Sequence, residues 1–198
     1  MNDRFFAFAK FTVGVILRAV WRFQVFGADH VPMSGPLIVA ANHVSYLDPP
    51  ALGCALPRPI RYMAKAELFR IPVLGATIAA LGTFPVDRGK GDLQAVRRSL
   101  AVLDNGGAIG IFPEGTRNKD GTAQAQTGVA MLAAYSGAPV QPAYISGSAR
   151  ADKLHKITVT FGKPMHFTKK SRTDRDELKQ WRDDIMTSIL ALNPEANP

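Results

Sequence analysis

The sequence predicts an α/β fold: a mainly parallel β-sheet flanked by helices on both faces, with an additional helix at the N-terminus. Short apolar, β-prone runs alternate with helical patterns over most of the 198 residues, and polar groups suited to chemistry directly follow two of those runs. The first 26 residues are much richer in aromatic side chains than the rest of the chain. With 46% hydrophobic residues, the chain has enough apolar side chains for one core.

The N-terminal segment, residues 5–26, has the pattern of one amphipathic helix lying in a membrane interface. Its polar positions recur every fourth residue and form one narrow stripe on an otherwise aromatic and aliphatic helix: Lys10, Gly14, Arg18 and Arg22. We expect the aromatic side chains at the acyl boundary and the cations among lipid phosphates. The alternative is a helix packed on the domain's own core. The longest uncharged run, residues 11–17, is far too short to span a bilayer, and we expect no signal peptide because Lys10 interrupts the apolar segment.

The rest of the chain, residues 27–198, has the pattern of one domain in which strands and helices alternate. Strands are expected at residues 37–41, 60–64, 82–88, 108–112, 140–145 and 157–161, and helices at residues 49–56, 66–81, 92–105, 127–136 and 174–192. Pro72 interrupts the second of these helices, and its apolar portion at residues 71–81 is expected either to be fully buried or to face lipid. Asp92 is expected to cap the next helix, and Gly137 to end the one after it.

The formal charge of the chain is +8, from 24 Lys and Arg against 16 Asp and Glu. Basic proteins of this size meet nucleic acid, anionic membranes or acidic partners. The sequence has no recognition-helix, RRM or zinc-finger pattern, so we expect an anionic phospholipid membrane surface as partner and no nucleic acid. A single cysteine, Cys54, excludes an internal disulfide, and the four histidines lack metal-ligand spacing. We therefore expect no metal, and a location at the cytoplasmic face of the cell membrane.

A histidine and a carboxylate follow the apolar run at residues 37–41, in the segment Asn42-His43-Val44-Ser45-Tyr46-Leu47-Asp48. A strand ending there places His43 at the carboxyl edge of the sheet, where open α/β sheets bind ligands. The spacing to Asp48 is about one and a half helical turns, so a turn can bring the carboxylate to one imidazole nitrogen. The other nitrogen would then be free to accept a proton. No Ser or Cys lies in a nucleophile elbow, so we expect the pair to act on a hydroxyl of the substrate. The alternative is a structural hydrogen bond without catalysis.

Two further segments carry groups suited to an anionic substrate. Arg88 and Lys90 alternate with glycines in a turn, and a flexible cationic loop of this kind fits a phosphate. Pro113-Glu114-Gly115-Thr116-Arg117 follows the run at residues 108–112 and brings an acceptor, a hydroxyl and a guanidinium to one turn. The Arg117 guanidinium matches a phosphate through two parallel hydrogen bonds. The alternatives are a solvated turn at Arg88 and an internal pair of Glu114 with Arg117.

Together, these segments resemble the glycerolipid acyltransferases. Asn42 to Asp48 is similar to the N-H-x-x-x-x-D motif of that family, Gly82-Thr83-Phe84-Pro85-Val86-Asp87-Arg88 resembles its second block, and Phe112-Pro113-Glu114-Gly115-Thr116-Arg117 is similar to its third, F-P-E-G-T-R. A fourth, apolar block around a proline fits residues 138–143. The blocks occur in the family's order. Asn118 and Gln141 depart from the usual residues beside the third block and in the fourth, which leaves the acceptor and donor preference open.

The resemblance implies an enzyme that moves a fatty acyl group from acyl-CoA or acyl-acyl carrier protein to the sn-2 hydroxyl of lysophosphatidate, giving phosphatidate in phospholipid biosynthesis. His43 would be the catalytic general base and Asp48 the residue that orients it, and the hydroxyl would attack the thioester directly. No cofactor would be needed beyond the acyl co-substrate. The residues that would bind the substrate are Arg88, Lys90, Glu114, Gly115, Thr116 and Arg117.

Three alternatives stay open. An acyltransferase of this type could act on glycerol-3-phosphate, another lysophospholipid or an amine-bearing lipid. A protein without catalysis could bind anionic membranes through residues 5–26. A hydrolase could release fatty acid, but it would need an activated water and usually a Ser or Cys nucleophile. Acyl transfer also requires an oxyanion hole, for which the backbone N–H groups of the turn at residues 42–48 are the candidates.

Overall fold

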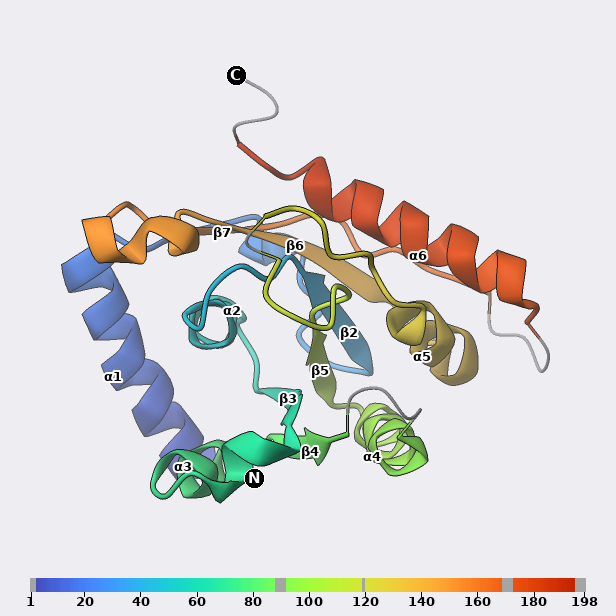
Figure 1. Ribbon diagram of the computed structural model, residues 1–198, viewed down its shortest axis with the longest axis horizontal. Coiled ribbons are helices and arrows are strands. Elements are labelled where there is room, and N and C mark those ends of the chain that lie inside the picture. The colour runs from blue at the N-terminus through green and yellow to red at the C-terminus, as the bar shows by residue number, and fades with distance from the viewer. Residues whose placement is uncertain (1–2, 88–91, 119, 169–172, 195–198) are drawn as a thin grey trace.

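The computed structural model describes residues 3–87, 92–118, 120–168 and 173–194. Within these residues the centre of the fold is a seven-stranded sheet in the order β1-β7-β6-β2-β5-β3-β4 (Figure 1). The strands are β1 (Gln24–Phe26), β2 (Leu37–Ala41), β3 (Ile60–Lys65), β4 (Phe84–Val86), β5 (Ala108–Ile111), β6 (Val140–Ser146) and β7 (Thr158–Phe161). Neighbouring strands run parallel except β6 and β7, which are antiparallel. The mainly parallel sheet that the sequence predicts is therefore confirmed.

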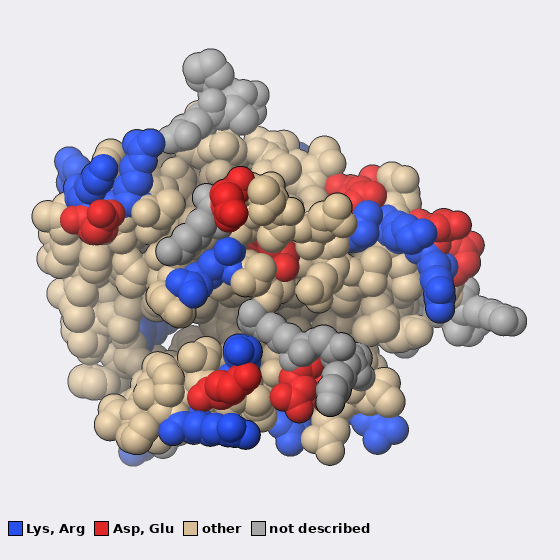
Figure 2. All heavy atoms as spheres, viewed as in Figure 1, with Lys and Arg blue, Asp and Glu red and all other residues tan. Residues whose placement is uncertain are grey.

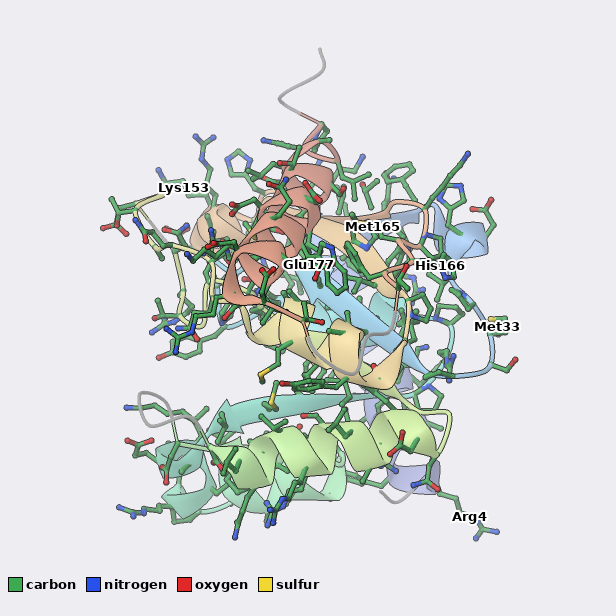
Figure 3. All side chains as sticks on the ribbon, turned by 90° about the vertical axis from the view of Figure 1, so that its right-hand side faces the viewer. Arg4, Met33, Lys153, Met165, His166 and Glu177 are labelled. Atoms are coloured by element: carbon green, nitrogen blue, oxygen red, sulfur yellow. The ribbon has the colours of Figure 1, made fainter. Side chains whose placement is uncertain are left out.

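Helices cover both faces of this sheet, as expected. On one face lie α1 (Asp3–Trp21) and α2 (Asp48–Ala55). On the other face α4 (Leu93–Asp104), α5 (Gly128–Ser136) and α6 (Arg175–Leu190) lie side by side (Figures 1 and 3). The remaining helices are short: η1 (Ala28–His30), η2 (Ala66–Arg70), α3 (Leu74–Ala80) and η3 (Ser148–Lys153).

Strand β2 is buried on both faces, which explains its uninterrupted apolar sequence. Leu37, Val39 and Ala41 contribute to the core beneath α1 and α2, whereas Ile38 and Ala40 contribute to the core beneath α4, α5 and α6. The strand lies between β6 and β5 and runs parallel to both. The residues that follow β2 therefore emerge at the carboxyl edge of the sheet, beside the ends of two parallel neighbours.

The expected helix caps are also present. The Asp92 side chain accepts hydrogen bonds from two backbone N–H groups in the first turn of α4. Gly137 ends α5 with a φ of 71°, in the left-handed region that glycine adopts without strain. The interruption at Pro72 is confirmed as well, since η2 and α3 lie on either side of it.

The predicted helix over residues 5–26 is too long at its C-terminal end. Helix α1 ends at Trp21, and Arg22 takes a left-handed conformation with a φ of 49°. Residues 24–26 instead form β1, which pairs with β7 at the edge of the sheet. Phe23, between the two elements, is buried in the core. Pairing with a distant strand therefore overrides the local helical pattern in these residues.

The polar stripe of α1 lies only partly against the protein: Lys10 and Gly14 face it, whereas Arg18 is exposed. The expectation that the cations lie among lipid phosphates is therefore wrong for Lys10 and stays a prediction for Arg18 and Arg22. The Lys10 ammonium donates a hydrogen bond to the Leu56 carbonyl at the C-terminal end of α2, where a helix dipole favours a cation, and burial lowers the pKa of Lys10. Gly14 is buried beside Cys54. Apolar side chains occupy the opposite, exposed face: Phe8, Phe11, Val15 and Ile16. One side of α1 thus packs on the domain, and the other side leaves apolar surface in solvent.

The segment at residues 71–81 is not buried, although burial was one of its two expected states. Ile71 is 46% exposed, Val73 80% and Leu74 41%, and Gly75 is the buried residue of α3. Among the described residues, no helix combines the length and the apolarity that crossing a membrane requires.

Candidate active site

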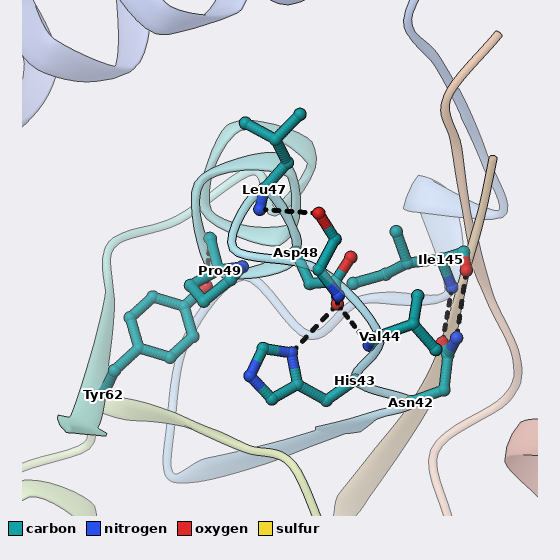
Figure 4. A network of polar contacts seen from close by, with 9 residues as sticks. Asn42, His43, Val44, Leu47, Asp48, Pro49, Tyr62 and Ile145 are labelled. Atoms are coloured by element: carbon teal, nitrogen blue, oxygen red, sulfur yellow. Dashed lines mark hydrogen bonds and ion pairs between the residues drawn. The ribbon is translucent and has the colours of Figure 1, made fainter. Parts of the chain in front are cut away.

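The turn after β2 brings His43 and Asp48 together, as their spacing predicts (Figure 4). Nδ1 of His43 lies 2.9 Å from Oδ2 of Asp48. Because an ionised carboxylate only accepts hydrogen bonds, Nδ1 carries the proton and Nε2 keeps a lone pair. The Asp48 side chain is fully buried, whereas 13% of the His43 side chain is exposed. The pair therefore has the geometry of a general base with a buried orienting carboxylate.

Asp48 holds the backbone of the turn as well as the imidazole. The same oxygen, Oδ2, accepts hydrogen bonds from the backbone N–H groups of Val44 and Ser45, each at 2.7 Å. Three donors on one oxygen stabilise the negative charge of the buried carboxylate. Asp48 is also the first residue of α2, where a helix dipole favours an anion.

The oxyanion hole expected in this turn is not available at the N–H groups that hold the turn together. Val44 and Ser45 donate to Asp48, and the Leu47 N–H donates to the Ser45 hydroxyl at 3.2 Å. The backbone N–H of His43 donates to the Glu114 carboxylate, in the loop after β5. Donors already committed to the fold cannot also stabilise a developing oxyanion, so the expectation is wrong for these positions.

Asn42 ties the end of β2 to the neighbouring strand β6. Its amide nitrogen donates to the Ile145 carbonyl at 3.0 Å, and its amide oxygen accepts from the Ile145 N–H at 2.7 Å (Figure 4). The Asn42 side chain thus takes the place of a backbone partner and continues the sheet by one step. This fixes the direction in which the chain leaves β2 and so the position of His43.

The loop after β5 packs directly against His43. The Phe112 ring stacks on the imidazole, with 4.3 Å between the ring centroids. The Glu114 carboxylate accepts a hydrogen bond from the backbone N–H of His43. The backbone N–H of Asn118 donates to the backbone carbonyl of His43 at 2.7 Å. Because β5 lies beside β2 and runs parallel to it, both segments emerge at the same edge of the sheet. The first and third sequence blocks therefore form one site.

Glu114 lies behind the histidine and is only 6% exposed. Burial raises the pKa of its carboxyl. Hydrogen bonds from the Asn118 side chain and from the backbone N–H of His43 act in the opposite direction and lower this pKa. One carboxylate oxygen, Oε2, has no hydrogen-bond partner among the described residues. The internal pair of Glu114 with Arg117 is not among the ion pairs of the described residues, so that alternative is wrong.

Arg117 lies over the turn that carries the catalytic pair. Its guanidinium carbon is 3.6 Å from the centroid of the Tyr46 ring, in the geometry of a cation–π contact. Thr116, its neighbour, is exposed. Gly115 has a φ of 68°, and a side chain there would meet the Gln126 amide at 2.7 Å, so the turn requires glycine. The structure thus brings a fixed guanidinium close to the His43 turn.

An aromatic stack supports the imidazole from behind. The Tyr62 ring is nearly parallel to Phe112, with 6.2 Å between centroids, and its hydroxyl donates to the Pro49 carbonyl at 3.0 Å. Burial raises the pKa of the Tyr62 hydroxyl well above its ordinary value, so it stays a hydrogen-bond donor. A side chain at Gly110 would lie 2.2 Å from the Tyr62 ring. Glycine in β5 therefore makes room for the stack.

An apolar cavity of about 230 Å³ adjoins the site between β5, α4 and α5. Phe112, the ring that stacks on His43, forms part of its wall. Its other apolar walls come from Met63, Val86, Val96, Ile111, Val129 and Leu132. Asp87, Asp92 and Gln126 also line the cavity. Arg88 and Lys90, predicted to bind phosphate, lie outside the described residues.

Comparison with known proteins agrees with this geometry. A family model described as Acyltransferase matches residues 22–146, which include the His43 turn and the loop after β5. The chain belongs to the Acyltransferase family. It is similar to a 1-acyl-sn-glycerol-3-phosphate acyltransferase of Bacillus subtilis, with 29% identity over 165 residues, which cover 81% of this chain and 82% of that protein. A lyso-ornithine lipid O-acyltransferase of Pseudomonas aeruginosa is 35% identical over 132 residues, 66% of this chain and 50% of that protein.

A solved structure supports the fold of this acyltransferase. The 1-acyl-sn-glycerophosphate acyltransferase of Thermotoga maritima superposes with a TM-score of 0.71, covering 100% of this chain and 85% of that one at 23% identity. Membership of the family makes the protein an enzyme that transfers acyl groups.

Sequence reasoning missed several residues that position the site of this acyltransferase. Asn42 and Phe112 lie in the recognised motifs, but the sequence assigns them no role, and it predicts Tyr62 only as part of the strand at residues 60–64. A signal existed for Tyr62, since a glycine inside a buried strand such as Gly110 often marks the close approach of another group. Among the described residues, no group of three or more His, Cys, Asp and Glu side chains is placed to hold a metal ion.

Proposed function

We propose that this acyltransferase moves a fatty acyl group from acyl-CoA or acyl-acyl carrier protein to the sn-2 hydroxyl of lysophosphatidate, producing phosphatidate for phospholipid biosynthesis. The observation that carries the proposal is the His43–Asp48 pair, in a turn whose Tyr46 ring carries the Arg117 guanidinium. A base with a fixed cation on its own turn suits an acceptor with a hydroxyl near a phosphate. The similarity to the Bacillus subtilis enzyme, whose name includes this acceptor, supports the same choice.

The proposed reaction needs one base and no covalent enzyme intermediate. Nε2 of His43 takes the proton of the acceptor hydroxyl while the hydroxyl oxygen attacks the thioester carbonyl. The tetrahedral intermediate collapses, the carbon–sulfur bond breaks, and the imidazolium returns the proton to the departing thiolate. Asp48 holds Nδ1–H and stabilises the imidazolium that forms between these steps.

The apolar cavity beside Phe112 suits the hydrocarbon chain of an acyl group. Its wall includes the ring that stacks on His43, so a chain seated there ends next to the base. Burial of the chain against Met63, Val129 and Leu132 would contribute about 0.8 kcal/mol for each methylene group removed from water. We propose that Arg117, with Arg88 and Lys90, holds the phosphate of the acceptor.

We also propose that α1 seats the enzyme on the cytoplasmic face of the cell membrane. The helix exposes five large apolar side chains, two of them Phe8 and Phe11, at 66% and 72%. A helix of this kind binds the interface through its apolar side. Phe8→Ser with Phe11→Ser should reduce sedimentation with vesicles of anionic phospholipid. Leu93→Ser is the control, because Leu93 is 70% exposed and its helix, α4, covers the other face of the sheet. Equal losses in both proteins would contradict the proposal.

A thiol-release assay tests the reaction. Purified protein in detergent receives an acyl thioester with lysophosphatidate, with glycerol-3-phosphate or with no acceptor, and His43→Ala is measured in parallel. Thiol release that requires lysophosphatidate and disappears in the variant is the expected result. Thiol release with glycerol-3-phosphate would identify that compound as the acceptor in place of lysophosphatidate. Thiol release without any acceptor would indicate hydrolysis.

A second candidate acceptor is a lyso-ornithine lipid. The similarity that favours it is the 35% identity to the Pseudomonas aeruginosa enzyme, although the match spans only 50% of that protein. Such an acceptor has a carboxylate and an amine in place of the phosphate. The same assay with lyso-ornithine lipid as acceptor separates the two, since thiol release would then require that lipid in place of lysophosphatidate.

A further inference from the structure

A second cavity, of about 280 Å³, adjoins the histidine turn on its β6 side. Asn42 and Val44, the two sequence neighbours of His43, contribute to its wall. The rest of the wall comes from the end of β6, from η3, from the segment leading to β7 and from Asn193. The apolar cavity lies on the β5 side of the same turn. His43, at the end of β2, is therefore placed between the two cavities.

The second cavity differs from the first in charge. Arg150, His155 and Lys156 line it, and no acidic residue does. None of these three side chains takes part in an ion pair of the described residues. Asp152 lies in the same short helix, but it does not line the cavity. Figure 2 shows Lys and Arg side chains gathered over η3, at the upper left of the molecule. The cavity is thus suited to an anion.

The order of these features along the sheet edge matches the chemical order of an acyl thioester. The apolar cavity, the base and the basic cavity follow β5, β2 and β6, which are adjacent strands. An acyl thioester has an apolar chain, then the reacting carbonyl, then a pantetheine arm that ends in phosphate. Both coenzyme A and acyl carrier protein attach the acyl group through such an arm.

We propose that the basic cavity binds the phosphate of the acyl donor's pantetheine arm, through Arg150 and Lys156 with His155 beside them. The inference rests on the acyl transfer proposed above and names the place of the donor in it. The acceptor's phosphate is then held at Arg117, in the loop after β5, which does not line the basic cavity. The two anionic substrates therefore do not compete for one cation.

A series of truncated donors tests the assignment. The donors are acyl-CoA, the same thioester without the 3′-phosphate of the nucleotide, and acyl-pantetheine, which has no phosphate. The double variant Arg150→Gln with Lys156→Gln should raise the KM for acyl-CoA about tenfold, the effect of losing one charge-assisted hydrogen bond. Its KM for acyl-CoA should approach the wild-type value for acyl-pantetheine, so that the preference between these donors disappears. If the double variant instead loses the preference for acyl-CoA over the thioester without the 3′-phosphate, the cavity binds the 3′-phosphate and the proposal is wrong. Acyl carrier protein, whose arm has a single phosphate, tests the other source of the arm.

Lys153→Gln is the matched control. Lys153 also lies in η3 and is exposed at the outer edge of the molecule, but it does not line the cavity (Figure 3). An equal KM increase in this variant would overturn the proposal, because the effect would then come from general charge. A double variant with a higher KM for lysophosphatidate and an unchanged KM for the donor would also overturn the proposal.

Equilibrium binding of free CoA, followed by titration calorimetry, separates this inference from the proposed reaction. Weaker CoA binding in the double variant supports the site even if no acceptor is ever acylated. Wild-type protein that releases thiol but binds CoA no better than the double variant would overturn the site and leave the reaction standing. Wild-type protein that neither binds CoA nor releases thiol from any donor would overturn both.

Discussion

The turn at residues 42–48 and the loop at residues 112–118 both hold His43, but they do so through contacts of different range. Within the turn, Asp48 receives all its hydrogen bonds from residues three to five positions away. The loop reaches His43 across about a third of the chain, through the Phe112 ring, the Glu114 carboxylate and the Asn118 N–H. The turn sets the chemistry of the imidazole, and the loop sets its position.

The electrostatic state of the two carboxylates differs in the same way. Three N–H donors converge on one oxygen of Asp48 and stabilise its negative charge. Burial raises the pKa of Glu114. Each carboxylate has one buried oxygen without a partner among the described residues, Oδ1 of Asp48 and Oε2 of Glu114, so the difference lies in the donors on the other oxygen. We therefore expect changes in the turn to abolish turnover, and changes in the loop to alter substrate affinity or stability.

The largest effect is expected from His43→Ala. Loss of the base should lower kcat by about two to four orders of magnitude, the usual contribution of general base catalysis. The stack with Phe112 is also lost, which should cost only about 0.5–1.5 kcal/mol of stability. Thiol release and a thermal melt, measured on the same preparation, separate the two effects. Substantial residual turnover in a folded variant would contradict the assignment of His43 as base.

Asp48→Asn should come next, and it should affect both activity and folding. The neutral amide no longer stabilises the imidazolium, so kcat should fall by about 10²- to 10⁴-fold. Three N–H groups also lose a charged acceptor, which should lower the free energy of unfolding by about 1–3 kcal/mol. Urea unfolding followed by Trp fluorescence measures the second effect. A variant with full stability and no activity would show that Asp48 orients the base without holding the turn.

In the loop, Arg117→Lys should change affinity more than turnover. A lysine keeps the charge but loses the planar stack on Tyr46 and the paired hydrogen bonds to a phosphate. The KM for lysophosphatidate should rise about tenfold with little change in kcat, the loss of about 1.4 kcal/mol of binding. Tyr46→Phe, which keeps the ring, is the control and should leave this KM near the wild-type value. A fall in kcat alone would assign Arg117 to the reaction step.

The range of these contacts also explains what the sequence could predict. The His43–Asp48 pair follows from a five-residue spacing, and the parallel sheet follows from the alternation of apolar runs with helical patterns. Asn42 finds its partner 103 residues away, and the stack of Phe112 with Tyr62 depends on which strands are neighbours. Gly110 signals that some group approaches β5 closely, but no local pattern identifies the partners in such pairs, so their roles emerged only from the fold.

Helix α1 illustrates the same limit at the level of an element. Its pattern correctly predicts a helix with one polar stripe, but periodicity does not say which side has a partner. The carbonyl that ends α2 accepts a hydrogen bond from the Lys10 ammonium, so this part of the stripe faces the protein, whereas Arg18 on the same stripe and the aromatic side remain exposed. Residues 24–26 likewise form a strand because β7 offers them a partner, not because of their own preference.

The smallest effect on turnover, and the clearest test of the difference between the two carboxylates, is expected from Glu114→Gln. The amide oxygen can still accept a hydrogen bond from the backbone N–H of His43, so the loop keeps its position while the side chain can no longer ionise. In the wild type, burial raises the pKa of the Glu114 carboxyl, so the folded protein binds the carboxyl proton more tightly than the unfolded chain does. The free energy of unfolding should therefore fall as the pH rises from the ordinary range of a Glu carboxyl through the raised folded-state value.

That fall should be smaller in Glu114→Gln, so the stability of the variant should gain on the wild type toward neutral pH. Urea unfolding at a series of pH values from 4 to 8 measures both curves. Glu114→Ala is the control, since it removes the acceptor as well as the charge and should be less stable than Glu114→Gln throughout. Parallel curves for wild type and Glu114→Gln would show that Glu114 titrates alike in the folded and unfolded chain. The contrast with Asp48 would then rest on hydrogen bonding alone.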